Sequence, residues 1–400
     1  MPPDFPTVAS LLADSGAPDF VRHFTHAPNS LVRFGVGVAT EVGTLVAALK
    51  VQRVLVVTDS GIAATSHLTT IVDSLEQAGL HVTVFSEVQE NPTTLVVDAC
   101  VAAAQRCSAQ ALIGLGGGSS MDAAKGCNFI LTNGGQMQDY WGMDKATRPM
   151  LPFIAIPTTA GTGSECQSFA LISDAVTHAK MACGDRKAAA CIALLDPQLT
   201  LTQPALVTRH TGIDALTHAL ESAVSTKSTD TSRAYSRAAF ALLSQGFPAV
   251  LADPQNLLAR SQMLLGAALA GVAIENSMLG AAHACANPLT AQFNIVHGEA
   301  VGVMMPHVLA FNLTQPAARQ VYQELATFIQ LQATDLPGWF TQLLQLSGLP
   351  LNLRHWNILP TDLFGLATAC AQQWTGTFNP VKVSELVFQQ LLADCMGSEK

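Results

Sequence analysis

Charged side chains are scarce in this sequence. Only 12% of its 400 residues are charged, and its 20 Lys and Arg against 29 Asp and Glu give a formal net charge of -9. No basic patch of the kind that binds nucleic acid is present, so nucleic acid is excluded as a partner. Hydrophobic residues make up 49% of the chain, which indicates a large core. We therefore expect two domains and further apolar surface buried in an oligomer, a homodimer.

Paired cysteines, a leader and a membrane span are also missing. The nine cysteines contain no C-x-x-C pair, and such a dispersed, odd set is typical of reduced thiols in the cytoplasm. The start, MPPDFPTVAS, lacks the basic and apolar regions of a signal peptide. Apolar windows such as residues 264–273 are interrupted before about 20 residues, the length of a span. The sequence predicts a cytoplasmic protein without a membrane partner.

Apolar periodicity changes along the chain. Strands are predicted at residues 51–59, 81–88, 111–118 and 153–159, with helices up to residue 78 and at 93–105 and 119–131. Strands alternating with helices predict an α/β domain with a Rossmann-like parallel sheet, residues 1–200. Beyond a boundary near 196–204, Ala/Leu-rich runs predict an all-helical domain, residues 201–400. Its helices should be separated at Pro248, Pro254, Pro288, Pro306, Pro337, Pro350 and Pro360. We expect a ligand site in the cleft between the domains.

The stretch HTGIDALTHALES carries two metal-ligand types at helical spacing. On a helix, Asp214 and His218 share one face with Cβ atoms roughly 5–6 Å apart. Carboxylate with imidazole suits a first-row metal ion, although an isolated pair of this kind is more often structural. Downstream, GAAHACANPLTAQFNIVHGEAVG adds His283 and His297 in apolar surroundings. The four side chains make a plausible ligand set.

A glycine-rich turn is predicted between the third strand and its helix. In GLGGGSSMDAAKG, Gly116 to Ser119 let the backbone approach an anion at a helix N-terminus. The turn departs from G-x-G-x-x-G at Ser119 and from the Walker A loop, so by itself it is equally compatible with a turn that binds nothing. Asp59, ending the strand 51–59, could accept from ribose hydroxyls and repel a 2′-phosphate, or simply cap a helix. The small-residue loop 157–165 is suited to closing over a cofactor.

Four motifs in this order resemble the iron-containing (group III) alcohol dehydrogenase family over nearly the whole chain: GGGSSMDAAKG, IPTTAGTGSE, GIDALTHALES and HACANPLTAQFNIVHG. The resemblance implies a dehydroquinate synthase-like fold and an oxidoreductase that interconverts small alcohols and aldehydes or ketones. It implies NAD rather than NADP, and Fe2+ with Zn2+ as the alternative. The implied catalytic and metal residues are Asp214, His218, His283 and His297. The implied coenzyme residues are Asp59, Asn91 on the adenine side, Gly116, Gly117, Gly118, Ser119, Thr158, Thr159, Thr162, and Lys180 near the nicotinamide ribose.

Two positions depart from the family pattern. Many members have a proton-relaying histidine four residues after the third ligand, where this chain has Asn287, and an arginine is lost after Asn379-Pro380. We therefore expect uncharged alcohols, primary or vicinal-diol, and aldehydes as substrates, unless Lys180 or Lys382 supplies a charge. The alternatives are a dehydroquinate synthase-like lyase, a reductase of a carboxylated substrate such as maleylacetate, and a non-catalytic NAD-binding protein. The few basic residues disfavour the lyase.

Overall fold

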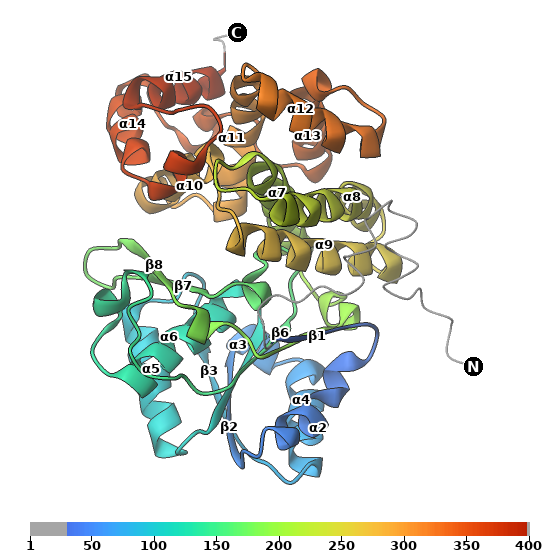
Figure 1. The fold of residues 1–400 in the computed structure, drawn as a ribbon, viewed down its shortest axis with the longest axis vertical. Helices are drawn as coiled ribbons and strands as arrows, with labels where there is room; N and C mark the ends of the chain where they lie inside the picture. Colours follow the sequence, from blue (N-terminus) through green and yellow to red (C-terminus); the bar gives the residue numbers. More distant parts are fainter. Residues whose placement is uncertain (1–29, 398–400) are drawn as a thin grey trace. The chain divides into compact units, whose positions relative to one another are not determined.

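The computed structural model describes residues 30–397, which form two compact units, residues 30–203 and 204–397. The first unit contains the strands and the second is helical (Figure 1). The expected class, a parallel-sheet domain followed by a helical one, is confirmed.

A six-stranded sheet in the order β1-β9-β6-β4-β2-β3 is the centre of the first unit, and all its neighbouring strands are parallel. Its strands are β1 (Leu31–Phe34), β2 (Arg53–Asp59), β3 (His81–Val88), β4 (Ala111–Gly116), β6 (Phe153–Pro157) and β9 (Ile192–Leu195). Strands β1 and β9 were not predicted, because four residues each are too few for a clear periodic signal. The glycine turn therefore follows the fourth strand of the chain, not the third.

Helices cover both faces of this sheet. Successive side chains of β2 alternate between two cores: Leu55 and Val57 pack in one, Val54 and Val56 in the other. The first core includes α5 (Thr94–Arg106) and α6 (Gly118–Asn133), and the second α2 (Val42–Ala48) and α4 (Ser66–Gln77). A short helix α3 (Ser60–Ala63) follows β2. Burial on both faces explains the continuous apolar runs of β2 and β4.

A second, three-stranded sheet in the order β5-β8-β7 was not predicted. It comprises β5 (Gly142–Met143), β7 (Phe169–Ser173) and β8 (Lys180–Gly184), with β7 and β8 antiparallel. The 3-10 helix η4 (Ser164–Cys166) leads into it. β5 has only two residues and β7 and β8 have five each, so these strands are too short to give a clear periodic signal in the sequence.

The second unit is built of helices: α7 (Ala205–Val224), α8 (Asp230–Ala252), α9 (Leu257–Glu275), α10 (Ala281–Phe293), α11 (His297–Asn312), α12 (Pro316–Ala326), α13 (Leu336–Ser347), α14 (Leu363–Ala371) and α15 (Glu385–Met396). Pro248, Pro288 and Pro306 lie inside α8, α10 and α11, so the prediction that they separate helices was wrong. Packing of these helices outweighs the roughly 3 kcal/mol that an internal proline costs.

One helix among the described residues, α9, is long and apolar enough to cross a membrane. Of its most apolar window, 83% is buried inside the protein. Burial of this kind is what a core helix requires, so α9 is a core element of the helical unit.

Candidate metal centre and dinucleotide turn

The helix α7 presents a carboxylate and an imidazole on one face. Asp214 and His218 lie one turn apart in this 20-residue helix, and both side chains are buried. His283 is the third residue of α10, and His297 is the first residue of α11. Three helices thus supply the four predicted ligands.

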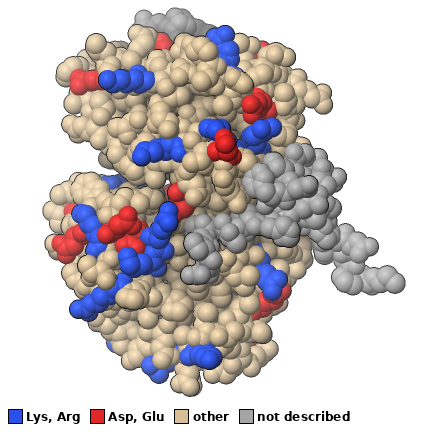
Figure 2. All heavy atoms as spheres, in the orientation of Figure 1, with Lys and Arg blue, Asp and Glu red and all other residues tan. Residues whose placement is uncertain are grey.

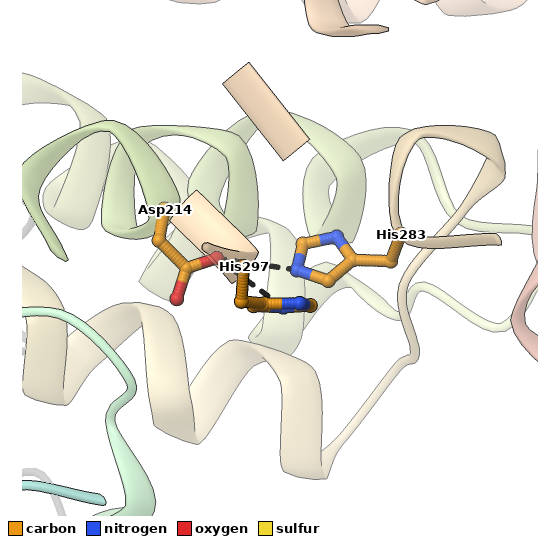
Figure 3. A group of neighbouring side chains, drawn as sticks. All are labelled: Asp214, His283 and His297. Carbon is orange, nitrogen blue, oxygen red and sulfur yellow. Dashed lines mark ion pairs between the residues drawn. The ribbon is translucent and has the colours of Figure 1, made fainter. Parts of the chain in front are cut away.

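The side chains converge on one oxygen, Asp214 Oδ1. The Nε2 atoms of His218 and His283 each lie 3.4 Å from it, and His297 Nε2 lies 3.9 Å away. Donor atoms of Asp214, His283 and His297 all lie within 4.8 Å of one another (Figure 3). The His218 ring stacks on the His283 ring with centroids 4.9 Å apart. The structure therefore brings all four predicted ligands together.

These distances fit a divalent ion. Bonds of about 2.1 Å at tetrahedral angles place two ligand atoms about 3.4 Å apart, the separation seen here. Among the described residues, Asp214 Oδ1 and His283 Nε2 are buried without a hydrogen bond of acceptable geometry. The two atoms face each other at 3.4 Å, which is longer than a normal hydrogen bond, and an ion bound between them would bond to both.

Charge balance favours a cation at this centre. Burial opposes ionisation of Asp214, yet the three histidines hold its pKa well below the usual range. Burial also lowers the pKa of His283, but Glu221 and Asp214 outweigh burial and raise that pKa to about 9. The two carboxylates thus hold a positive charge on His283, and a metal ion would supply that charge in its place.

Other residues near the motifs have structural contacts. His210 Nε2 lies 3.1 Å from Glu299 Oε1, which ties α7 to α11. Cys285 is buried, and a hydrogen bond with Cys370 and burial raise its pKa. Asn287 donates from Nδ2 to Gln373 Oε1 at 3.0 Å.

In the first unit, the turn between β4 and α6 adopts the conformation that its glycines allow. Gly116 has φ +144, and a Cβ there would lie 2.5 Å from Ser120 Oγ and 3.3 Å from Asp59 Oδ2. Gly117 is the N-cap of α6 and so leaves the first N–H groups without a side-chain cap. Asp59, at the end of β2, therefore lies beside the turn that follows the neighbouring strand β4. Both lie at the carboxyl ends of the strands, the edge at which parallel sheets bind ligands.

The threonine loop packs against the same turn. A Cβ on Gly117 would lie 3.3 Å from Thr159 Oγ1, and one on Gly118 would lie 2.8 Å from Thr162 Cγ2. The backbone N–H of Thr158 donates to Gly116 O at 2.9 Å. A side chain at Gly118 would displace Thr162, so the close packing of this loop on the turn favours glycine there.

The remaining predicted coenzyme residues form a chain of contacts from the same helix end. The Asn91 N–H donates to Ser119 Oγ at 3.3 Å, and Lys180 Nζ donates to Asn91 Oδ1 at 3.3 Å. The resemblance places Asn91 on the adenine side and Lys180 near the nicotinamide ribose, and the structure shows the two side chains in contact. Four of the ten predicted coenzyme residues thus form the turn, five lie against it, and Lys180 is joined to it through Asn91.

Lys125 and Glu221 are buried charged residues near these sites that were not predicted from the sequence. Lys125 of α6 is fully buried and donates to Ser164 O, Ser164 Oγ and Phe169 O at 2.7–3.0 Å, which holds the loop after β6 against α6. Glu221 of α7 is buried beside His283. A charged residue inside an apolar helical stretch was the available signal, and Glu221 also shares the helix face of Asp214, seven residues before it.

A parallel sheet with a glycine-rich turn at a helix N-terminus, together with a carboxylate–imidazole cluster, is typical of metal-assisted dinucleotide-dependent enzymes. Residues 29–197 match the family described as iron-containing alcohol dehydrogenase, and residues 208–396 match the C-terminal part of that family. The chain belongs to the iron-containing alcohol dehydrogenase family and is an oxidoreductase acting on CH–OH donors.

Individual relatives agree with this membership. The chain is 35% identical to the NAD-dependent methanol dehydrogenase of Bacillus methanolicus over 75% of this chain and 78% of the relative. It is 32% identical to alcohol dehydrogenase 4 of Saccharomyces cerevisiae over 88% and 93%. The crystal structure of a 1,3-propanediol oxidoreductase superposes with a TM-score of 0.87 at 29% identity, covering 91% and 97% of the two chains.

Proposed function

We propose that this protein oxidises small uncharged alcohols, and reduces the corresponding aldehydes, with NAD and a divalent ion held by Asp214, His218, His283 and His297. The observation that carries the proposal is the approach of three imidazole Nε2 atoms to a single buried carboxylate oxygen at 3.4–3.9 Å. The family and its NAD-dependent relatives support Fe2+ and NAD as cofactors, with Zn2+ as the alternative ion. Relatives named as dehydrogenases favour this reaction over that of a lyase.

The residues have distinct roles in this proposal. Asp214, His218, His283 and His297 would hold an ion that supplies Lewis acidity, and the turn of the first unit would hold the coenzyme that supplies hydride chemistry. Asp214 contributes the negative ligand that compensates the ion, and the imidazoles bind as neutral donors. The turn at Gly116 to Ser119 offers free N–H groups for the pyrophosphate, and Asp59 accepts from the adenosine ribose.

The substrate should approach the metal from the side of His297. Its side chain is 26% exposed, whereas those of Asp214, His218 and His283 are 4–7% exposed. The two ligand-bearing stretches, residues 210–222 and 280–302, contain no Lys or Arg that could clamp a carboxylate or phosphate. This supports uncharged alcohols and aldehydes, primary or vicinal-diol, over hydroxy acids.

Ligand variants test the metal assignment. His283→Ala and His297→Ala should each lose the bound ion and the activity, measured by metal analysis and by NADH formation with a panel of alcohols, diols and hydroxy acids. His307→Ala is the matched control, because His307 also lies in α11 but outside the ligand group. Full metal occupancy in the two ligand variants would refute the assignment, and preference for a carboxylated substrate would refute the substrate class.

Assembly and location complete the proposal. We propose a homodimer in the cytoplasm, because the sequence is strongly apolar and all nine cysteines are free thiols. Large apolar side chains on or beside the three-stranded sheet are exposed, among them Trp141, Met143 and Val176. Light scattering on the purified protein should give twice the 42.0 kDa chain mass, and a mass of one chain would contradict the dimer.

A further inference from the structure

Glu221 is a buried carboxylate that lies directly behind the candidate metal centre. It follows Asp214 by two turns of α7, and its side chain is only 1% exposed. Figure 3 shows the ring of His283 pointing one edge toward Asp214. The opposite ring nitrogen, Nδ1, is the atom that faces Glu221. A carboxylate that is both buried and close to a ligand needs partners that stabilise its charge.

Three donors supply that stabilisation, and all belong to the start of α10. His283 Nδ1 donates to Glu221 Oε2 at 2.6 Å, the Gly280 N–H donates to the same oxygen at 3.0 Å, and the Ala282 N–H donates to Oε1 at 2.6 Å. A Cβ on Gly280 would lie 3.0 Å from Glu221 Oε1, so glycine permits this close approach. The carboxylate therefore binds the helix terminus and the imidazole that it carries.

The bond to Nδ1 determines which ring nitrogen of His283 can bind a metal. A neutral imidazole has one N–H and one lone pair, and an ionised carboxylate can only accept. When His283 loses one proton to bind a cation, the remaining proton is therefore held on Nδ1, and the lone pair is left on Nε2, the atom 3.4 Å from Asp214 Oδ1. An outer carboxylate that fixes a ligand in this way also makes it a better donor.

We propose that Glu221 is a positioning residue that fixes the Nδ1–H form and the orientation of His283, and thereby sets the affinity of the centre for its metal ion. The inference rests on the proposed function, since it requires that His283 binds an ion. Glu221 touches neither substrate nor coenzyme in this role. It acts through His283 alone.

Capping of α10 is a separate contribution that must be distinguished from positioning. Asn379 also caps this helix, because its Oδ1 accepts from the Ala281 N–H at 3.3 Å. The Asn379 amide is held in turn by Asn312, to whose Oδ1 it donates at 2.7 Å. Asn379 therefore shares the capping function of Glu221, while the bond to the His283 imidazole comes from Glu221. This difference makes Asn379 a matched control.

The experiment measures metal affinity. Purified full-length protein, stripped with a chelator, is titrated with Zn2+ and Co2+ against a chromophoric chelator, and the absorption spectrum of the Co2+ form reports ligand geometry. Glu221→Gln should weaken metal affinity by about 10–100-fold, which is the range typical for loss of a residue that hydrogen-bonds a metal ligand. It should also alter the Co2+ spectrum. Asn379→Ala should lower the unfolding temperature yet keep the affinity and spectrum of the unchanged protein.

The outcomes distinguish a failure of the proposed function from a failure of the role proposed for Glu221. Unchanged protein that binds neither ion would refute the proposed function itself. Binding by the unchanged protein, with equal affinity and spectrum in Glu221→Gln, would refute the role of Glu221 alone. Equal losses of affinity in Glu221→Gln and Asn379→Ala would also refute it, because capping would then explain both. If Glu221→Gln does not fold, Glu221→Asp replaces it in the experiment. Aspartate keeps the negative charge but is shorter by one methylene group, so its carboxylate lies farther from His283. A metal affinity of Glu221→Asp equal to that of the unchanged protein would overturn the proposal.

Discussion

Asp214 and Asp59 illustrate how one residue type takes two roles according to its surroundings. Asp214 is enclosed by imidazoles, which keep its pKa low despite burial. Asp59 ends β2, where its Oδ1 accepts from the Ile62 N–H at 2.9 Å as the N-cap of α3 and its Oδ2 points at the glycine turn. The capping and the ribose-binding interpretations of Asp59 are therefore compatible, because each uses a different oxygen.

We predict that Asp59→Gly relaxes coenzyme preference. It removes a charged hydrogen-bond acceptor worth about 1.5–3 kcal/mol, so affinity for NAD should fall by about tenfold or more, while NADP is no longer repelled. Asp59→Asn, which keeps the cap and loses only the charge, should admit NADP with less loss of stability. Steady-state kinetics with both coenzymes measures the ratio, and an unchanged preference in both variants would contradict the role of Asp59.

At the scale of elements, close approach of α7 and α11 holds two of the ligands together. Gly298 follows His297 at the start of α11, and a Cβ there would lie 2.3 Å from the backbone oxygen of His210. Backbone cannot yield as a flexible side chain can, so the crossing requires glycine. The distance between His297 and Asp214 thus depends on the packing of the two helices.

Gly298→Ala should accordingly separate α7 from α11. We expect a loss of about 1–3 kcal/mol in unfolding free energy, together with weaker metal binding as His297 moves away from Asp214. Gly365→Ala in α14 is the control, because nothing lies within 4 Å of its Cβ position, and there alanine should stabilise the helix by roughly 0.5–1 kcal/mol. Denaturant unfolding and metal titration of both variants measure the effects. Equal behaviour of the two variants would show that the crossing tolerates a methyl group.

At the scale of the whole molecule, pH couples to stability through a buried carboxyl of the first unit. Glu165 in η4 is 2% exposed, and among the described residues its Oε1 has no hydrogen-bond partner. Burial raises its pKa from 4.5 to about 7, although a backbone hydrogen bond and Lys125 act in the opposite direction. Between these two values the folded protein keeps a proton that the unfolded chain has lost. Stability is therefore fully present below pH 4.5 and falls as pH rises through 7.

Glu165→Gln should abolish this dependence. Because about 1.4 kcal/mol accompanies each pKa unit, the variant should gain roughly 3 kcal/mol relative to the unchanged protein between pH 4.5 and pH 8. Denaturant unfolding across this range measures the difference. Glu76→Gln, at an exposed position of α4, serves as the control and should show no such gain. Parallel pH profiles for Glu165→Gln and the unchanged protein would contradict the buried, titrating state.

The amino-acid sequence by itself determined the features that depend on neighbours along the chain. Apolar periodicity was enough to predict β2, β3, β4 and β6 and the change to helices, and four-residue spacing placed Asp214 and His218 on one helix face. Family membership followed from motifs that are also local. Predictions based on weak local signals were wrong or missing. The short strands β1 and β9 were not predicted, and three prolines expected to separate helices lie inside helices.

Only the tertiary structure decided which side chains meet across elements. His297 reaches Asp214 because α11 packs on α7. His283 reaches Asp214 and Glu221 because α10 packs on α11 and its N-terminus is hydrogen-bonded to Glu221 of α7. Lys125 reaches Ser164 in the same way, through folding that joins residues 39 positions apart. Such contacts depend on the packing of whole helices and on glycines that allow backbones to approach, so no spacing within a single segment encodes them.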